Sequence, residues 1–490
     1  MAKRKRQAAV SSEPAAEPVP VKKSKASDDK KPKPKPTPTG PSVPETIQIV
    51  AGSYDRVLHG FTVSIGTKGE AEFADTFLFN AHASAIRCIA VSPPSAPAPG
   101  QTQKVLLASG STDERIHVYN LSAYPPSKKN QKLMANVAPR PILENPKNRE
   151  LGTLLHHEST VTALRFPTRS KLLSSSDDST IAVTRTRDWS MLSTIKAPKA
   201  IAHGRPSGDT APFGGTPSGV NDFAIHPSMK LMISVSKGER CMRLWNLVTG
   251  KKAGVLSFSR DMLQEIGESR HSTGEARRVV WGNADGADEF AVGFERDVIV
   301  FGMDSVPKCR VMPGSKSKIH QFSYVTLDEE SGSTMIAVAT EDGRIAFFST
   351  KTDHLSQPDA TEKVNGIEPS LPVAKYLGQI GGSKEGVSGR IKDFTVVASN
   401  ASPGTLYVVG SSSDGRVRLW VVRVEELQKA CDKAAEEPIG RLAGTYETHN
   451  RITCMAAYLM LARPEGVEDS EEELGEEDDD EEDDSESDEE

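Results

Sequence analysis

Histidines are the side chains in this sequence most able to do chemistry, and the adjacent pair His156 and His157 is the strongest candidate for a metal site. Imidazole is a common zinc ligand, but a zinc site needs three or four ligands at characteristic spacings. No second cluster of histidines or cysteines with such spacing accompanies this pair. A histidine beside the start of a strand more often holds a loop by hydrogen bonds, so we expect no metal site and assign the same structural role to His82 and His449.

Motifs for catalysis and for cofactor binding are also missing from the sequence. It contains no G-x-x-x-x-G-K-[ST] phosphate-binding loop, no G-x-S-x-G nucleophile elbow and no H-E-x-x-H zinc helix. The glycine pairs at 214–215 and 381–382 lack the following helix that a dinucleotide site needs, so we expect them to be loops. The sequence therefore predicts no catalytic residue, no cofactor and no enzymatic activity.

Basic side chains offer the remaining chemistry, which is the binding of anions. An insertion at residues 122–150 carries six basic and two acidic residues, which suits salt-dependent contact with RNA phosphates. A solvated insertion without a partner explains it equally well. Five more basic residues lie in or beside expected first strands, at a face that the pattern does not identify. The candidate RNA or partner surface consists of Lys128, Lys129, Lys132, Arg140, Lys147 and Arg149 in the insertion and Arg87, Arg165, Arg278, Arg390 and Lys392 in the strands.

Composition limits the class of protein. A chain of 490 residues with 37% hydrophobic residues is long enough to bury a large core, and an all-β domain of several hundred residues is one unit. The five cysteines are dispersed, odd in number and without a C-x-x-C pair, which favours a reduced intracellular protein. Since no stretch approaches about 18 consecutive apolar residues, we expect neither a membrane span nor secretion.

The N-terminal residues 1–46 are rich in proline, lysine, alanine and serine and have few large apolar side chains. Such a segment cannot offset the entropy of ordering, so we predict that it is disordered. Its basic clusters are typical of a nuclear-import signal, with a solvated charge run as the alternative. The residues of the expected signal are Lys3, Arg4, Lys5, Arg6, Lys22, Lys23 and Lys25.

The C-terminal residues 461–490 form a second tail that we predict to be disordered. Residues 464–490 contain 19 acidic and no basic residues, so the net charge of −7 leaves about +12 on the rest of the chain. The tail suits binding of basic proteins such as ribosomal proteins or histones, internal competition for the basic surface, or simple solubilisation. Three serines have an acidic residue three positions later and are candidate phosphorylation sites: Ser470, Ser485 and Ser487.

Between the tails the sequence repeats one pattern. Residues 408–420, VVGSSSDGRVRLW, read as a β-hairpin with an Asp-Gly turn. The same order of a small-residue strand, an acidic or glycine turn and an alternating strand recurs at 106–119, 172–184, 232–245 and 337–348, with a weaker copy at 290–301. A repeat of this period indicates sheets stacked in an array.

Counting strands gives a seven-bladed, all-β propeller over residues 47–460. Three strands at 47–51, 57–65 and 72–79 are one short of a blade, and the segment 451–459 has no partners of its own. If this C-terminal strand joins the first three, the ring closes and no sheet edge stays open. Six further units begin with strands expected at 85–91, 161–166, 219–225, 276–281, 319–325 and 390–397. Long insertions at 122–150, 196–218 and 351–371 are expected to be surface loops.

The repeat resembles the WD40 repeat, in which a loop histidine, a strand serine or threonine, a turn aspartate and a strand tryptophan form a buried relay of hydrogen bonds. The likeness is incomplete, because no Trp-Asp dipeptide occurs, Tyr119 and Thr184 replace the tryptophan in two repeats, and Gly410 replaces the serine in the last. The residues that the resemblance assigns to the relay are His82, Ser109, Asp113, His157, Ser174, Asp178, Trp245, Asp414 and Trp420.

A narrower resemblance, to the PAK-interacting-protein family that includes the fungal Mak-type protein, covers residues 47–459. It is carried by AGSYDRVLHGF at 51–61, HH at 156–157 before VTALRF at 161–166, IHP at 225–227, LWNLVTG at 244–250 and RITC at 451–454. The resemblance implies a nucleolar assembly factor of the large (60S) ribosomal subunit. It also implies a link to inhibition of p21-activated kinases in animal relatives.

We therefore expect a non-enzymatic WD40 scaffold in the nucleus and nucleolus, a monomer within a larger assembly. The expected partners are proteins of the large-subunit precursor, precursor rRNA through the basic loops, and basic proteins through the acidic tail. The alternatives are an inhibitory regulator of p21-activated kinases and a chaperone of histones or other basic proteins. A substrate receptor of a cullin-type ubiquitin ligase is disfavoured, because the W-D-x-R motif of such receptors is missing.

Overall fold

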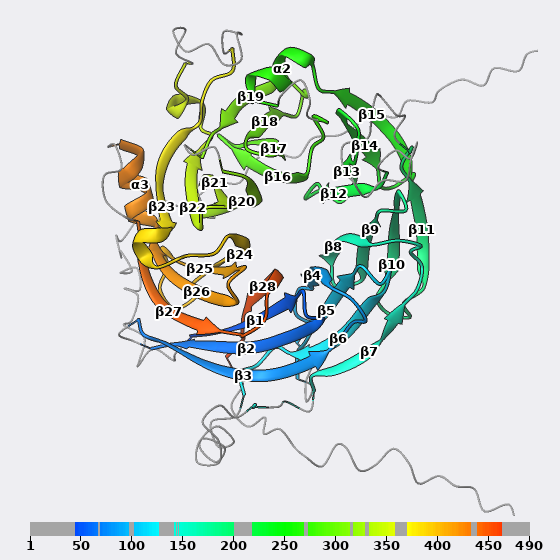
Figure 1. Ribbon diagram of the computed structural model, residues 1–490, viewed down its shortest axis with the longest axis vertical. Coiled ribbons are helices and arrows are strands. Elements are labelled where there is room, and N and C mark those ends of the chain that lie inside the picture. The colour runs from blue at the N-terminus through cyan, green and yellow to red at the C-terminus, as the bar shows by residue number, and fades with distance from the viewer. Residues whose placement is uncertain are drawn as a thin grey trace, which may run out of the picture. The chain divides into compact units, whose positions relative to one another are not determined.

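The protein folds into a ring of seven four-stranded antiparallel sheets, seen end-on in Figure 1. The computed structural model describes residues 45–66, 69–97, 102–126, 142–143, 145, 147–199, 218–268, 273–313, 317–328, 333–357, 370–432 and 439–462. Each sheet is one blade, with an inner strand nearest the axis and an outer strand at the rim. The predicted seven-bladed propeller is confirmed.

The strands follow the predicted order, and blades are numbered here from the one that contains residue 45. From the inner to the outer strand, blade 1 consists of β28 (Ile452–Leu459), β1 (Glu45–Ser53), β2 (Val57–Ile65) and β3 (Ala71–Asn80). Blade 2 consists of β4 (Ile86–Val91), β5 (Lys104–Ser111), β6 (Ile116–Ser122) and β7 (Arg149–Leu154). Blade 3 consists of β8 (Val161–Thr168), β9 (Lys171–Ser176), β10 (Thr180–Arg185) and β11 (Met191–Lys196). Blade 4 consists of β12 (Val220–Ile225), β13 (Leu231–Ser236), β14 (Cys241–Asn246) and β15 (Lys251–Ser257). Blade 5 consists of β16 (Arg278–Ala284), β17 (Ala287–Gly293), β18 (Val298–Gly302) and β19 (Pro307–Val311). Blade 6 consists of β20 (Ile319–Asp328), β21 (Ser333–Thr340), β22 (Arg344–Ser349) and β23 (Lys375–Gly381). Blade 7 consists of β24 (Ile391–Ala398), β25 (Thr405–Ser412), β26 (Arg416–Arg423) and β27 (Arg441–Glu447).

The C-terminal strand closes the ring, as predicted. β28 pairs antiparallel with β1, with Ile47 opposite Leu459 and Gly52 opposite Cys454. Blade 1 therefore takes its inner strand from the end of the described chain and its other three strands from the beginning. This pairing removes the open edges that β1 and β28 would otherwise present.

The described part of the ring extends slightly beyond the predicted limits of 47 and 460. β1 begins at Glu45, because this carboxylate accepts hydrogen bonds from blade 7: Tyr407 Oη at 2.8 Å, Ser399 Oγ at 2.6 Å and two backbone N–H groups. Burial opposes ionisation of Glu45, but these hydrogen bonds outweigh it and lower its pKa. At the other end, the Leu461 N–H donates to the Ala123 carbonyl at 2.8 Å. The remaining residues of both predicted tails lie outside the described residues.

Seven hydrophobic clusters hold the ring together, and each spans two neighbouring blades. The cluster between blades 1 and 7, for example, packs Ile49 and Phe61 against Val409 and Leu419, all fully buried. Alternating strand residues supply the apolar faces, because successive side chains point to opposite faces of a sheet. Stability therefore depends on every blade having two neighbours.

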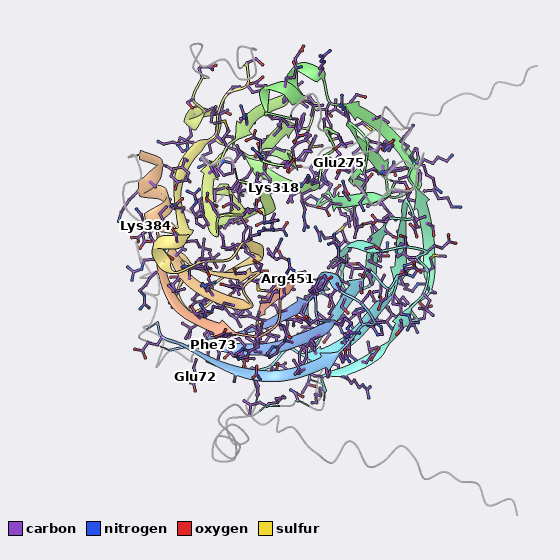
Figure 2. The ribbon with its side chains drawn as sticks, in the orientation of Figure 1. Glu72, Phe73, Glu275, Lys318, Lys384 and Arg451 are labelled. Carbon is purple, nitrogen blue, oxygen red and sulfur yellow. The ribbon has the colours of Figure 1, made fainter. Side chains whose placement is uncertain are left out.

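A bulge recurs at the second residue of six inner strands, where the pairing register with the adjacent strand shifts. A bulge leaves one residue unpaired and re-aims its side chain. The residues at these positions are Arg87, Thr162, Asn221, His320, Lys392 and Thr453. Arg451, immediately before β28, lies at the inner rim of the ring (Figure 2).

Among the described residues, two α-helices lie between strands of the ring, and the all-β prediction did not include them. α3 (Val424–Asp432) follows β26 and buries Leu427 in the cluster between blades 6 and 7. α2 (Arg260–Glu265) follows blade 4 and is capped by Ser259, whose hydroxyl accepts from the Met262 N–H. Helix-forming residues in both connections override the strand pattern of the repeat.

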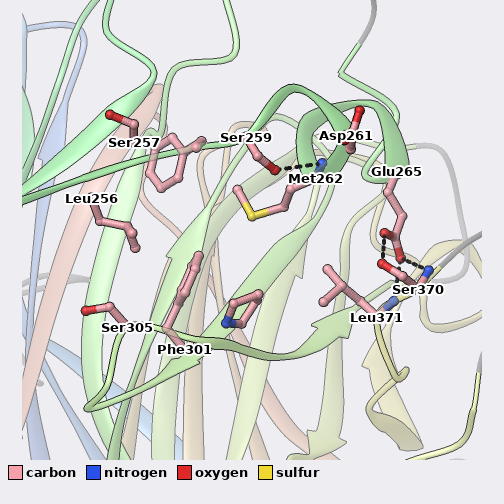
Figure 3. A pocket seen from close by; sticks show the side chains of 12 residues that line it. Leu256, Ser257, Ser259, Asp261, Met262, Glu265, Phe301, Ser305, Ser370 and Leu371 are labelled. Carbon is pink, nitrogen blue, oxygen red and sulfur yellow. Dashed lines mark hydrogen bonds between the residues drawn. The ribbon is translucent and has the colours of Figure 1, made fainter.

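α2 borders a cavity of about 310 Å³ (Figure 3). Glu265 is buried and accepts hydrogen bonds from the Leu371 N–H at 2.7 Å and from the hydroxyl and N–H of Ser370. The insertion at 351–371, predicted as a surface loop, is therefore anchored to the ring at its end, where Leu371 is buried.

Candidate functional site

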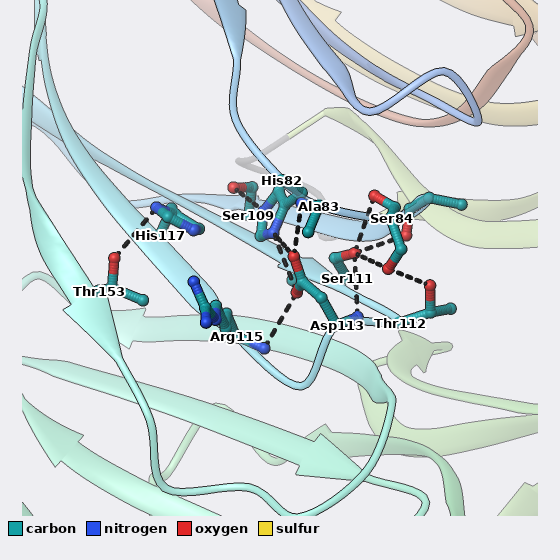
Figure 4. Close-up of polar contacts among 12 residues, drawn as sticks. His82, Ala83, Ser84, Ser109, Ser111, Thr112, Asp113, Arg115, His117 and Thr153 are labelled. Atoms are coloured by element: carbon teal, nitrogen blue, oxygen red, sulfur yellow. Dashed lines mark hydrogen bonds and ion pairs between the residues drawn. The ribbon is translucent and has the colours of Figure 1, made fainter.

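The relay of blade 2 joins the loop before β4 to the β5–β6 hairpin (Figure 4). His82 Nε2 lies 2.8 Å from Ser109 Oγ, and His82 Nδ1 lies 3.1 Å from Asp113 Oδ2. Burial lowers the pKa of His82 against the opposing charge of Asp113, so the ring is neutral at pH 7. Because a carboxylate only accepts, Nδ1 donates to Asp113 and Nε2 accepts from the Ser109 hydroxyl. Every polar atom of the ring is thus engaged in holding a loop.

Blade 3 repeats the same arrangement and adds a second imidazole. His157 Nε2 lies 2.8 Å from Ser174 Oγ, and His157 Nδ1 lies 3.0 Å from Asp178 Oδ2. His156 Nε2 also lies 3.0 Å from Ser174 Oγ, and burial together with the neighbouring His157 lowers the pKa of His156 to about 4. The histidine pair converges on a serine hydroxyl.

The two tryptophans of the expected relay differ from each other. Trp245 Nε1 donates to Ser234 Oγ at 2.8 Å, as a relay tryptophan does. Trp420 Nε1 donates instead to Glu385 Oε2 at 2.8 Å, because Gly410 supplies no hydroxyl there. Glu385 ends η2 (Ser383–Glu385), a 3-10 helix. This short helix directly follows the glycine pair at 381–382, and it is the pair that the sequence predicts to be a loop.

Asp414 takes part in no histidine relay in the described part of the chain. Its Oδ2 lies 3.2 Å from Arg418 Nη2, and its Oδ1 accepts from the Arg416 N–H at 3.0 Å. His449, expected to hold a loop, is exposed with a φ of 59°. Thr448 holds that loop instead, since its hydroxyl donates to the Gly415 carbonyl at 2.8 Å.

Four of the predicted basic surface residues lie on inner strands, on four different blades. We call them the inner cations: Arg87 on β4, Arg165 on β8, Arg278 on β16 and Lys392 on β24. The sequence placed them near a face of the propeller. The structure places them around the axis, because inner strands surround it (Figure 1).

The charges of the inner cations act on groups of other blades. Burial raises the pKa of Cys88 in blade 2 to about 12. The charges of Arg165, Arg87 and Arg278 oppose that rise, although Arg278 belongs to blade 5. Arg278 thus acts on a thiol three blades away, and both residues belong to inner strands that surround the axis.

Lys392 is the most crowded of the inner cations. Burial lowers its pKa, and the positive charges of Arg390 and Arg451 lower it further, with Glu341 acting in the opposite direction. His320 lies beside it, and burial followed by the charge of Lys392 lowers the pKa of His320 to about 4. The His320 Nε2 atom is buried without a hydrogen-bond partner among the described residues.

Acidic groups compensate only part of this charge. Asp222 Oδ1 lies 3.2 Å from Arg165 Nη2 and is the ion-pair partner of that inner cation. Arg87, Arg278 and Lys392 form no ion pair with any residue that the structure describes. Asp393, also on an inner strand, is occupied by the Met455 N–H at 3.0 Å and by Gln321 Nε2 at 3.2 Å.

The other predicted surface residues that the structure describes do not lie on inner strands. Arg390 is exposed and paired with Glu341 at 3.0 Å, Lys147 Nζ donates to Thr102 Oγ1 at 2.9 Å, and Arg149 is exposed at the start of the outer strand β7. Several predicted residues lie outside the described residues: Lys3, Arg4, Lys5, Arg6, Lys22, Lys23, Lys25, Lys128, Lys129, Lys132, Arg140, Ser470, Ser485 and Ser487.

Metal and thiol chemistry have no visible site in the described ranges. No group of three or more histidine, cysteine, aspartate or glutamate side chains there is arranged to hold a metal ion. All five cysteines are free thiols, and burial raises the pKa of both Cys88 and Cys309 to about 12. Within the same ranges, no helix has the length and apolar character needed to cross a membrane.

Sequence reasoning missed three residues around the inner cations. His320 and Arg451 belong to inner-strand starts, and aligning the first strands of the repeats on Arg87 and Lys392 would have found them. Asp222, which pairs with Arg165 from the next blade, has no comparable signal because the two residues lie 57 positions apart.

Comparisons with known proteins agree with this architecture. The family model "WD domain, G-beta repeat" matches residues 148–183, which run from β7 to β10. A p21-activated protein kinase-interacting protein 1-like protein of Xenopus laevis is 25% identical over 427 residues, covering 87% of this chain and 85% of that protein. Protein MAK11 of Saccharomyces cerevisiae is 26% identical over 404 residues, covering 77% and 78%. Shk1 kinase-binding protein 15 of Schizosaccharomyces pombe is 23% identical over 425 residues, covering 86% and 88%. The family resemblance predicted from the sequence is confirmed by these similarities.

Proposed function

The chain is a WD40-repeat propeller similar over most of its length to PAK-interacting protein 1-like proteins and MAK11, and on this premise we propose that it is a non-enzymatic scaffold for assembly of the large ribosomal subunit. It acts on early precursor particles in the nucleolus and binds assembly factors or ribosomal proteins. Propellers host many unrelated tasks, so the fold alone does not select this role. The selection comes from the family resemblance.

The observation that carries the proposal is the extent of the similarity. Alignments with the relatives run over 404 to 427 residues, which is far more than one repeat. Similarity confined to single blades would reflect the fold only. Similarity around a whole ring includes loops and blade surfaces, which are the parts of a propeller that partners contact.

Polar chemistry inside the described blades is consistent with binding rather than turnover. The histidines of the two relays are engaged with serine and aspartate in fixed loops. Burial raises the pKa of the Cys88 and Cys309 thiols, which disfavours the reactive thiolate. Rigid loops on a rigid ring suit a scaffold, because little entropy is lost when a partner binds.

Purification of the tagged full chain from its own cells, followed by gradient sedimentation and RNA identification, tests the assembly role. We expect recovery with particles that contain large-subunit precursor rRNA. A control with the tag alone sets the background. Recovery with small-subunit precursors, or with no ribosomal precursor, contradicts the proposal.

The proposal assigns a role to each tail: the N-terminal tail carries a nuclear-import signal, and the C-terminal tail binds partner proteins. The basic residues at 3–6 and at 22, 23 and 25 direct the chain to the nucleus, so their replacement by alanines leaves a fluorescently tagged chain in the cytoplasm. The acidic segment 464–490 binds basic proteins, and phosphorylation of its serines adds negative charge. Nuclear accumulation that is unchanged without the basic cluster contradicts the first assignment.

Kinase regulation is the second candidate function, favoured by the names of two relatives. The Xenopus protein is named for interaction with p21-activated kinase, and the fission-yeast protein for binding of Shk1 kinase. This role requires saturable binding of the full chain to the regulatory segment of such a kinase, with lowered kinase activity. Kinase activity that stays constant at saturating chain concentration excludes it.

A further inference from the structure

We propose that the inner cations form a binding site for a compact, multiply phosphorylated small molecule at the axis of the propeller. The site consists of Arg87, Arg278 and Lys392, with Arg165 as a fourth cation already paired to Asp222. This inference concerns a ligand of the ring itself and is independent of the role in ribosome assembly.

The first argument is convergence. The inner cations come from blades 2, 3, 5 and 7, and their positions in the sequence span more than half of the chain. Arg278 and Arg165 both influence the buried Asp393 of blade 7, and Arg87 influences Lys392. Each of the four lies on the inner strand of its blade, and the inner strands of these blades surround one axis.

The second argument is uncompensated charge. Arg87, Arg278 and Lys392 have no ion-pair partner among the described residues, whereas their neighbours Arg165, Arg390 and Lys318 are each paired with a carboxylate. Like charges gathered inside a ring repel one another where water is partly excluded. A bound anion removes this repulsion, and the cations then become favourable contacts.

The third argument is the position of the side chains on the strands. Arg87 and Lys392 occupy inner-strand bulges, where Thr162, Asn221 and Thr453 occupy the equivalent places in other blades. Those three donate hydrogen bonds to the backbone of the neighbouring blade, at 2.6 to 2.9 Å. The two cations make no such contact among the described residues, so the bulge that elsewhere ties blades together here carries charge at the axis.

The chemistry of the site selects phosphate groups. Three of the four inner cations are arginines, whose planar guanidinium matches two phosphate oxygens at once. Cations on the inner strands of four blades surround one axis, which suits a compact molecule with phosphates on several sides. A nucleic acid strand presents its phosphates in a line and would reach few of them. His320, whose Nε2 has no hydrogen-bond partner among the described residues, belongs to the inner strand of the blade next to that of Lys392 and provides a further polar contact.

Calorimetric titration of the full chain with inositol hexakisphosphate tests the site. We expect saturable binding of one molecule per chain and a rise in the melting temperature of the ring. In the variant Arg87→Gln/Arg278→Gln/Lys392→Gln, affinity falls by about tenfold for each cation removed, since a charge-assisted contact contributes roughly one such factor. The variant without ligand melts at or above the temperature of the wild type, because repulsion is removed and no ion pair is broken.

A matched control removes the same charge from exposed positions that are not on inner strands. Lys171, Lys251 and Lys252 are exposed, so the variant Lys171→Gln/Lys251→Gln/Lys252→Gln should bind inositol hexakisphosphate within about twofold of the wild type. Equal losses in both triple variants would mean that net charge and not the axis attracts the anion, and would overturn the proposal. It is also overturned if inositol hexakisphosphate fails to bind, or if the inner variant loses only affinity for single-stranded RNA.

Discussion

Glu45 offers the sharpest test of how the ring is closed, because its carboxylate connects blade 1 to blade 7. Replacing it by alanine leaves Tyr407 Oη and Ser399 Oγ without an acceptor, and both side chains are buried, at 5% and 8% exposure. A buried donor left unsatisfied costs about 1–3 kcal/mol. Water replaces the carboxylate at the exposed N–H groups of Asn400 and Ala401, which add little. We expect Glu45→Ala to lower the free energy of unfolding by about 2–4 kcal/mol.

Urea unfolding followed by circular dichroism measures this change, with Glu447→Ala as the matched control. Glu447 is a half-exposed strand glutamate of blade 7 with one long ion pair, 3.9 Å from Arg416, so its removal should cost less than about 0.5 kcal/mol. Glu45→Gln keeps an acceptor oxygen but loses the charge, and should fall between wild type and Glu45→Ala. If Glu45→Ala unfolds with the same free energy as Glu447→Ala, the carboxylate does not hold the two blades together.

The pH dependence of the same variant follows from the lowered pKa of Glu45. Its ordinary value is 4.5, and hydrogen bonds hold the folded value below it against the effect of burial. The folded protein therefore binds fewer protons than the unfolded chain, and the contribution of Glu45 is complete above pH 4.5 and lost as the pH falls through the folded pKa. The difference between wild type and Glu45→Ala should thus be constant from pH 6 to 8 and shrink below about pH 4.5. A difference that grows on acidification would contradict this assignment.

Three further predictions concern single side chains. Asp178→Asn weakens the relay of blade 3, since Asp178 accepts hydrogen bonds from His157 Nδ1 and from the N–H and hydroxyl of Thr180. In urea unfolding it should lower the free energy of unfolding by about 1–3 kcal/mol. A decrease below about 0.5 kcal/mol would contradict a structural relay. Gly415→Ala should lower the melting temperature, because Gly415 has a φ of 82° and an added Cβ would lie 2.9 Å from a backbone oxygen of Asn450; an unchanged melting temperature would show that the turn relaxes. Cys88, with its pKa raised to about 12, should resist alkylation at pH 8 until the ring is unfolded, as mass spectrometry of labelled peptides reports; rapid labelling of the native chain would contradict its burial.

The sequence was sufficient for the blades because each hairpin is encoded locally. A small-residue strand, a turn with an acidic residue or glycine and a second alternating strand fix one hairpin within about 15 residues, and repetition fixes the array. Closure followed from counting strands, since three at the start and one at the end complete a blade. α3 was missed because the repeat predicts strands only, whereas residues 424–432 have helix-forming side chains after β26.

The candidate site was predicted less well, because its geometry depends on the curvature of the ring. Arg87 and Lys392 were recognised as basic residues of first strands, but nothing in the sequence shows that side chains 305 positions apart share the axis. Partners across blades are equally hidden. Trp420 binds Glu385, 35 residues before it, and Glu45 binds Ser399, 354 residues after it, and neither contact follows from the repeat.

Closure of the ring by β28 is the feature on which the blade count, the inner strands and the convergence of charge all depend. Amide hydrogen exchange of the native full chain, read by mass spectrometry of peptides from β28 and from β24, measures it directly. Both are inner strands with one paired neighbour, so closure predicts similar protection in residues 452–459 and 391–398. Exchange in β28 at the rate of an unstructured peptide, with β24 still protected, would show that the ring is open at blade 1.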